Sequence, residues 1–291
     1  MKLDPIFLLC CCATSILITT DALHLQMTTT NTIRNTHSHD TITVLGFGSL
    51  LSERSSRLTF PNLTHFRLGR VPHHRRVFAH PAPLFFKRGI ANVATQEICS
   101  LSAEYEVNSS FICSVFEVPS EGLVEMGHPS KDQHQTRMIP SQAFLEREEE
   151  FDIQQVPYLE GTVDVPNHHS SSSTHNNILL TSSPKVGILC CRSTDDQYRQ
   201  QWGNDRFLQQ FQSWGLETIW NYPTDSGIRP CATYLRHCVL AAQRMGPSCY
   251  QSFLDDTFLI DRTTTIRTYL KDYPEIMMTL PPPELAERYG G

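Results

Sequence analysis

Several signatures of common protein classes are missing from this chain of 291 residues. There is no basic stripe, and a net charge of −6 does not favour binding to a polyanion, so nucleic acid is not an expected partner. No H-E-x-x-H or C-x-x-C motif organises the 13 histidines and 10 cysteines, and we expect no metal site. The G-x-S-x-G turn of serine hydrolases and a full glycine-rich phosphate loop are also absent.

The amino-terminal hydrophobic run, Ile6–Ile18, is too short to span a bilayer but has the length of the apolar part of a secretory signal. The alternative is a buried core segment. We predict a signal peptide at residues 1–22 and a disordered or transit-like segment at 23–41. The chain would then enter the secretory pathway, to be secreted or kept in the endoplasmic reticulum, or reach an organelle such as a plastid. It would keep no stable membrane anchor after removal of the signal.

The cysteines do not form a recognisable framework. Three of the 10 lie in the predicted signal, which leaves seven, an odd number at irregular spacing. We expect them to behave as small buried hydrophobic side chains. The alternative is a thiol enzyme that uses the adjacent Cys190 and Cys191, but both end an apolar strand with no neighbouring histidine in the sequence, which favours burial.

From about residue 42 the sequence predicts short strands that end at Gly, Pro or His-Pro. The expected strands are 42–47, 75–79, 98–105, 111–118 and 186–191. Apolar and polar residues alternate in 98–105 and in 111–118, and the polar segment Glu106–Ser110 between them predicts a β-hairpin. A helix is expected to begin at Pro119–Leu123.

Two polar insertions interrupt this region. Residues 127–141 are polar and flanked by prolines, and they predict an inserted loop before a second helical piece, Gln142–Phe151. Residues 167–177 are a low-complexity run of Ser, His and Asn that predicts a surface loop. After residue 191 apolar residues recur at helical spacing, so we predict a helical extension at 192–280 and a proline-rich tail at 281–291.

Two segments are candidates for a functional site. Gly46–Leu50 follows the first strand, and its two glycines allow backbone N–H groups to approach a bound anion, although a simple tight turn explains them equally. Leu145–Phe151 contains four glutamates, a pattern typical of a solvated helix face. Clustered carboxylates raise one another's pKa, so one that points into a cleft would suit proton transfer.

The order of these elements resembles the γ-glutamylcyclotransferase-like family. Phe47-Gly48-Ser49-Leu50 looks like the family's Tyr-Gly-Ser-Asn/Leu loop, and Val115–Val118 with Ser120–Leu123 looks like its strand-to-helix step. Leu145–Glu149 is similar to its Leu-Asp-x-x-Glu motif. The resemblance covers about residues 42–165. It implies an α+β fold, with a small mixed β-barrel domain over residues 42–191, to which the helical region is a C-terminal extension.

The resemblance also implies a reaction, that of a lyase- or acyltransferase-type enzyme of γ-glutamyl and glutathione metabolism. The α-amine of a small γ-glutamyl substrate attacks its own γ-carbonyl, which releases 5-oxoproline and an amine without a metal or organic cofactor. Glu149 would be the catalytic residue, with Glu148 and Glu150 as alternatives. The substrate would be bound by the loop Phe47, Gly48, Ser49 and Leu50. The alternative function is a non-catalytic module of this fold that binds a ligand or, through the helical extension, a protein partner.

Overall fold

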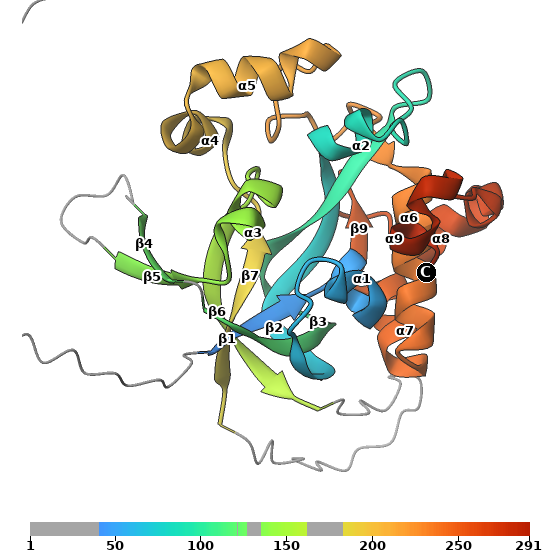
Figure 1. The fold of residues 1–291 in the computed structure, drawn as a ribbon. Helices are drawn as coiled ribbons and strands as arrows, with labels where there is room; N and C mark the ends of the chain where they lie inside the picture. Colours follow the sequence, from blue (N-terminus) through green and yellow to red (C-terminus); the bar gives the residue numbers. More distant parts are fainter. Residues whose placement is uncertain (1–40, 121, 127–134, 162–182) are drawn as a thin grey trace, which may run out of the picture. The chain divides into compact units, whose positions relative to one another are not determined.

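Two long antiparallel strands form the framework of the fold (Figure 1). The computed structural model describes residues 41–120, 122–126, 135–161 and 183–291. β2 spans Thr64–Pro81 and β3 spans Glu97–Pro119, and they pair along most of their length. Both strands are rich in the β-branched and aromatic residues that suit a half-buried sheet surface, among them Val77 and Phe116.

Three further strands close this pair into a barrel: β1 (Thr41–Gly46), β6 (Asp152–Glu160) and β7 (Lys185–Cys191). β1 is antiparallel to β3 and parallel to β7, whereas β6 is antiparallel to both β7 and β2. The strand order β3-β1-β7-β6-β2 returns to β3 through the β2–β3 pairing. Two short strands, β8 (Arg229–Pro230) and β9 (Thr257–Leu259), add to β3 and β2. The mixed β-barrel of the predicted α+β fold is confirmed.

Most helices lie above the barrel and along its right side in Figure 1, and most of them follow its last strand, which confirms the predicted helical character of the C-terminal extension. The α-helices are α1 (Glu53–Arg57), α2 (Pro83–Lys87), α3 (Gln142–Arg147), α4 (Asp195–Trp202), α5 (Asn204–Gln210), α6 (Ala232–Arg244), α7 (Pro247–Asp255), α8 (Ile266–Asp272) and α9 (Ala286–Tyr289). The 3₁₀ turns are η1 (Ser49–Leu51), η2 (Gln212–Trp214), η3 (Pro274–Met278) and η4 (Pro283–Leu285). In the described part of the chain, no helix combines the length and the apolar character that a membrane span requires.

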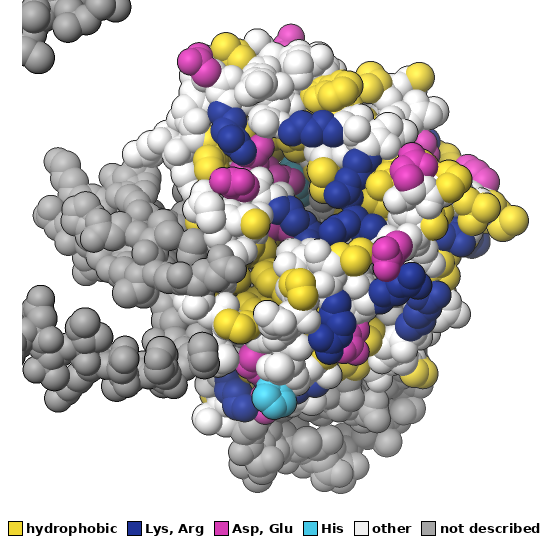
Figure 2. Space-filling model, in the orientation of Figure 1, with side chains coloured by type: hydrophobic (Ala, Val, Ile, Leu, Met, Phe, Trp, Pro, Cys, Tyr) yellow, Lys and Arg dark blue, Asp and Glu magenta, His cyan; other side chains and the backbone are white. Residues whose placement is uncertain are grey.

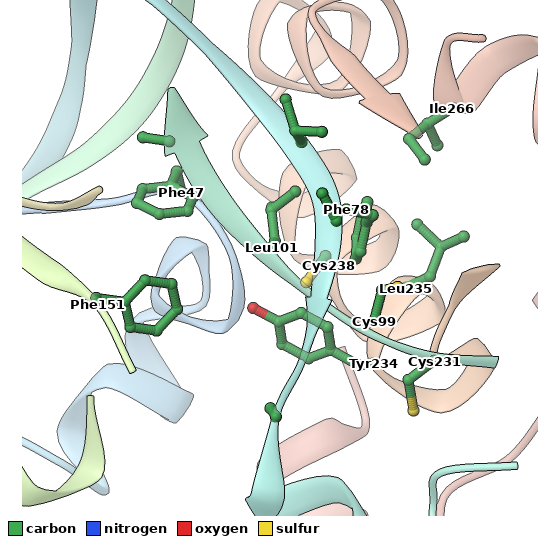
Figure 3. Packing of buried hydrophobic residues seen from close by; sticks show 14 of the residues in the cluster. Phe47, Phe78, Cys99, Leu101, Phe151, Cys231, Tyr234, Leu235, Cys238 and Ile266 are labelled. Atoms are coloured by element: carbon green, nitrogen blue, oxygen red, sulfur yellow. The ribbon is translucent and has the colours of Figure 1, made fainter. Parts of the chain in front are cut away.

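The C-terminal helices share one hydrophobic core with the barrel. α6 places Tyr234, Leu235 and Cys238 against Phe78 of β2 and Leu101 of β3 (Figure 3). These residues are buried, and residues 39–291 form one compact unit. The extension therefore contributes to the same core as the barrel.

A fully buried arginine joins α7 to the barrel. Arg76 of β2 donates from Nη1 to the carbonyl oxygen of Ile112 at 3.2 Å and from Nη2 to that of Ser252 at 2.5 Å. Its guanidinium carbon lies about 5 Å from the ring centroids of Phe111 and Phe253. Burial lowers the pKa of Arg76. A buried guanidinium needs such partners, so Arg76 fixes the position of α7 on β2 and β3.

The predicted hairpin is wrong, because 98–105 and 111–118 belong to one continuous strand, β3. Both halves pair with β2, with Tyr105 opposite His74 and Ser110 opposite Pro72. The polar residues between them form a bulge, in which Asn108 has a positive φ of 69°. The 18-residue length of β2 provides one partner for both halves, so the chain does not need to turn.

The predicted helix start after Pro119 is also wrong. Gly122–Met126 forms strand β4, which pairs with β5 (Gln135–Ile139), so residues 135–139 of the predicted inserted loop 127–141 form a strand instead. The helical piece expected over Gln142–Phe151 is shorter, because α3 ends at Arg147 and Glu148–Glu150 form a turn. The signal at 1–22, residues 23–40 of the transit-like segment, residues 127–134 and the insertion at 167–177 lie outside the described residues.

The seven cysteines of the described region are free, and all except the partly exposed Cys190 are buried. Burial raises the pKa of the Cys191 thiol to about 12 and that of Cys190 well above its ordinary value. Neither thiol ionises readily near neutral pH, so this pair lacks the thiolate that a thiol enzyme uses.

Candidate active site

The loop Phe47–Leu50 leaves β1 and enters η1, where its backbone is fixed by two serine hydroxyls. The Oγ of Ser114 donates to the carbonyl oxygen of Leu50 at 2.7 Å, and the Oγ of Ser56 donates to the same oxygen at 3.0 Å. These hydrogen bonds come from β3 and α1, so the loop is held from both sides.

Close packing requires two glycines here, Gly46 at the end of β1 and Gly48 in the loop. A Cβ on Gly46 would overlap Ser114 Oγ and lie 2.6 Å from the Cβ of Leu50. A Cβ on Gly48 would overlap the hydroxyl oxygen of Tyr234, which reaches the loop from α6. The glycines thus allow the loop to lie directly against β3 and the C-terminal extension.

Three consecutive glutamates, Glu148–Glu150, form the turn after α3, which we call the acidic turn. Their side chains have different surroundings. Glu148 and Glu150 line a pocket, and Glu149 is not among the lining residues. The carboxylate of Glu149 instead accepts a hydrogen bond from Arg206 Nε at 2.5 Å. Of the three alternatives, Glu150 is the buried carboxyl that faces the pocket, whereas Glu148 is paired with Arg147 at 3.1 Å.

Glu150 has the properties of a proton-transfer group. Its side chain is buried, with 6% of the residue exposed. Burial raises the pKa of Glu150 well above its ordinary value, and the neighbouring Glu148 raises it further. A carboxyl group with such a pKa exists in both protonation states closer to neutral pH than an ordinary glutamate does.

The pocket brings the loop and the acidic turn together. Its lining includes Phe47, Gly48, Ser49 and Leu50 of the loop, Glu148 and Glu150 of the acidic turn, and Tyr234 and Tyr289 of the C-terminal extension. The cavity measures about 70 Å³, several times the roughly 10–15 Å³ that one water molecule needs. All four predicted substrate-binding residues therefore share a pocket with two of the three candidate glutamates.

Tyr234 was not predicted as a site residue. Its hydroxyl points toward Phe47 and Phe151 and away from Cys231 and Leu235 (Figure 3). Burial raises the pKa of Tyr234 well above its ordinary value, so the hydroxyl remains a hydrogen-bond donor at neutral pH. No local sequence signal marked this residue, because Tyr234 belongs to an apolar helix face that predicts core packing.

Two tryptophans of the C-terminal extension bind the backbone of the acidic turn; we call them the indole pair. Trp202 Nε1 donates to the carbonyl oxygen of Glu149 at 3.0 Å, and Trp220 Nε1 donates to that of Glu150 at 3.1 Å. Because two consecutive carbonyl groups are fixed, the directions of the two side chains are fixed as well. The extension therefore determines which glutamate faces the pocket.

Trp220 is itself held in place from two sides. The carboxylate of Asp195, the first residue of α4, accepts hydrogen bonds from the backbone N–H groups of Ile219 at 3.0 Å and Trp220 at 2.9 Å. The indole ring stacks on His80, with 4.2 Å between ring centroids. Burial lowers the pKa of His80 to about 3, so this imidazole is neutral and adds no charge beneath the acidic turn.

Within the described residues, no group of three or more His, Cys, Asp and Glu side chains is arranged to hold a metal ion. The residues with polar side chains in the pocket lining are glutamates, tyrosines, serines, an arginine and a cysteine. Such groups can bind a polar organic ligand and transfer a proton.

No family model and no curated protein sequence matches this chain. Among solved structures, a protein named gamma-glutamyl cyclotransferase aligns with 82% of this chain and 100% of its own chain, at 10% sequence identity and a TM-score of 0.39. The barrel fold is established by the strand pairing within this chain itself.

We expect Gly48→Ala to destabilise the fold by about 1–3 kcal/mol, because the new methyl group overlaps the Tyr234 hydroxyl. Tyr234→Phe removes that oxygen, and the next contact of the methyl group is then the ring at 3.4 Å. Denaturant unfolding of both single variants and the double variant measures the coupling. An equal cost of Gly48→Ala in the Tyr234 and Phe backgrounds would contradict the packing argument.

We expect Trp220→Phe to cost about 1–3 kcal/mol of stability, because the carbonyl of Glu150 loses its indole donor while most of the ring contact with His80 remains. Trp214→Phe is the matched control, since Trp214 is 41% exposed and should change stability by less than about 0.5 kcal/mol. Thermal unfolding compares the two variants, and equal losses would show that the indole N–H contributes nothing specific.

Proposed function

We propose that this chain is an enzyme that releases 5-oxoproline from a γ-glutamyl compound by ring closure. The observation that carries the proposal is the presence of a buried carboxyl group with a raised pKa, Glu150, in the same pocket as the Phe47–Leu50 backbone. The sequence resemblance of the Phe47–Leu50 loop and of the Leu145–Glu149 segment to γ-glutamylcyclotransferase-like proteins supports the same reaction.

Ring closure needs little chemical assistance beyond correct positioning. The attacking α-amine and the γ-carbonyl belong to one molecule, and well-oriented intramolecular pairs reach effective concentrations of about 10⁵ M or more. The new bond joins the α-nitrogen to the γ-carbon, and the bond from that carbon to the leaving nitrogen breaks. The pocket has to hold the glutamyl chain bent, and its lining of Leu101, Phe144 and Phe151 provides an apolar surface for the methylene groups.

In the proposed reaction Glu150 transfers the proton. Its carboxylate form accepts a proton from the α-ammonium group, and the carboxyl form then donates that proton to the leaving nitrogen. The second proton that the α-nitrogen loses as the ring closes takes the same route, so the amine leaves as an ammonium ion and the enzyme ends in its starting state. An ordinary glutamate, with a pKa of about 4.3, is a weak base for an ammonium group with a pKa of about 8. Burial narrows that difference by raising the pKa of Glu150, which makes both transfers easier.

Two groups are suited to stabilise the negative charge on the γ-carbonyl oxygen as the ring closes. The residues Phe47–Leu50 line the pocket and their loop is fixed by Ser56 and Ser114, so in this proposal its backbone N–H groups bind the oxygen. The Tyr234 hydroxyl lies against Gly48 and stays protonated. Donors that are fixed before the reaction stabilise a developing oxyanion without reorganisation.

Glu149, the catalytic residue implied by the sequence resemblance, receives a different role in this proposal. Its carboxylate is bound to Arg206 and its carbonyl oxygen to Trp202, so both of its polar groups join the acidic turn to the C-terminal extension. We therefore assign proton transfer to Glu150 and positioning of the turn to Glu149.

The test compares two neighbouring variants, Glu150→Gln and Glu149→Gln. The purified full chain is incubated with glutathione, γ-glutamyl amino acids and γ-glutamylamines, and 5-oxoproline is measured. We expect Glu150→Gln to lower turnover by about 10²–10⁴-fold, because the proton carrier is lost. Glu149→Gln should keep turnover within about tenfold of the parent chain, because the ion pair that it breaks is partly exposed at Arg206.

Each other outcome has a distinct meaning. A large loss in Glu149→Gln, with Glu150→Gln active, returns the catalytic role to Glu149. If the parent chain binds γ-glutamyl compounds but releases no 5-oxoproline from any of them, the protein is a ligand-binding module and the proposed reaction is wrong.

A further inference from the structure

Three arginines from separate parts of the chain meet around Tyr289 at the pocket. Arg147 is the last residue of α3 and lines the pocket together with Tyr289. Arg88, the residue after α2, donates from Nη1 to the Tyr289 hydroxyl at 2.7 Å. Arg288 precedes Tyr289 in α9, and the charges of Arg147 and Arg88 add to burial in lowering its pKa. The positive charges of Arg88 and Arg147 therefore both act on Arg288.

Acidic side chains do not balance this charge. Within the described residues, one of these three arginines has an ion pair: Arg147 Nε lies 3.1 Å from a carboxylate oxygen of Glu148. Arg147 also donates to the hydroxyl of Thr59, and the other two guanidinium groups have no ion pair in the described part of the chain. Among these residues Arg88 and Arg288 thus have no ion pair of their own, and Glu148, the carboxylate whose charge acts on Arg288, is already paired with Arg147.

The surface reflects this excess. Figure 2 shows Lys and Arg side chains gathered around a hollow in the centre of the visible face, between the positions of α3 and α2 in Figure 1. Partly desolvated like charges that lie together raise the free energy of the unliganded protein, and an anion removes that cost. All three arginines are partly exposed, whereas Glu150 is buried. Arg147 lines the pocket, and Arg88 and Arg288 adjoin it through the pocket-lining Tyr289.

We propose that Arg88, Arg147 and Arg288 form a subsite for a doubly negative group on the ligand that occupies the pocket. The inference deepens the proposed function and rests on it in one respect: if the γ-glutamyl end lies at Glu150, the doubly negative group belongs to the leaving amine. Two unpaired guanidinium groups match two negative charges. Guanidinium groups bind carboxylate and phosphate oxygens in pairs of parallel hydrogen bonds, so a dicarboxylic amino acid and a phosphorylated amine both satisfy the subsite.

Binding is measured by calorimetry in the Glu150→Gln background, so that no probe is consumed. Two probes, γ-glutamylglutamate and γ-glutamylphosphoethanolamine, carry a doubly negative leaving group. The leaving group of γ-glutamylglutamine carries one negative charge, and that of γ-glutamylethylamine carries none. We expect the two doubly negative probes to bind at least about tenfold more tightly than γ-glutamylethylamine at low salt. Raising the salt concentration should reduce that preference. The better of the two probes identifies a carboxylate or a phosphate as the preferred source of the charge.

Arg288→Gln should remove most of the preference for the doubly negative probes and leave the affinity for γ-glutamylethylamine unchanged within about twofold. Arg88→Gln is the second variant, and circular dichroism checks that each protein is folded. Arg267→Gln is the control, because Arg267 lies on α8 and is paired with Asp255. It removes the same formal charge and should keep the full preference.

Two results would overturn the subsite: equal affinity for all four probes, or an equal loss for every probe in Arg288→Gln. Failure of the proposed reaction gives a different result. In that case the parent chain produces no 5-oxoproline from any probe, while a preference for doubly negative probes that depends on Arg288 still establishes the subsite.

Discussion

The two hydrogen bonds from Trp202 and Trp220 to the carbonyl oxygens of Glu149 and Glu150 constrain the rest of the site. Side chains of neighbouring residues in a turn point in different directions, so a fixed backbone sends one carboxyl group toward Arg206 and the next into the pocket. A rotation of this turn would exchange the two environments. The chemical difference between the two adjacent glutamates therefore comes from donors that lie more than fifty residues further along the chain.

The C-terminal helices consequently have a role in the site as well as in the core. Tyr234 of α6 and Tyr289 of α9 form part of the pocket, and Asp195 of α4 holds the segment that carries Trp220. The same helices are joined to the barrel through Arg76, which is buried between β2, β3 and α7. The segment expected to be a proline-rich tail supplies Tyr289 and Arg288. A barrel without these helices would lack one wall of the pocket and both donors to the acidic turn.

The sequence predicts the barrel well where local signals are strong. β1 and β7 are short apolar runs that end at polar or glycine-containing turns, and both were predicted within a residue. The continuous β3 was not predictable from its own residues, because a polar segment favours a turn unless one long partner strand pairs with both of its flanks. The choice among Glu148, Glu149 and Glu150 was not predictable either. Their local contexts are nearly identical, and the contacts that distinguish them come from Arg206, Trp202 and Trp220.

Glu150 of the acidic turn loses its proton at a higher pH than an ordinary glutamate, because it is buried in the pocket. Because the folded pKa is raised, the neutral form of Glu150 is favoured, and the free energy of unfolding should fall as pH rises from about 4.3 toward the folded pKa. The most direct measurement is a pH titration of the side-chain carboxyl carbons by ¹³C NMR, in the parent chain and in Glu150→Gln. We expect one carboxyl resonance that titrates at least one pH unit above the other glutamates and disappears in the variant. If every glutamate carboxyl titrates below about pH 5, Glu150 is an ordinary solvated acid and the account is wrong.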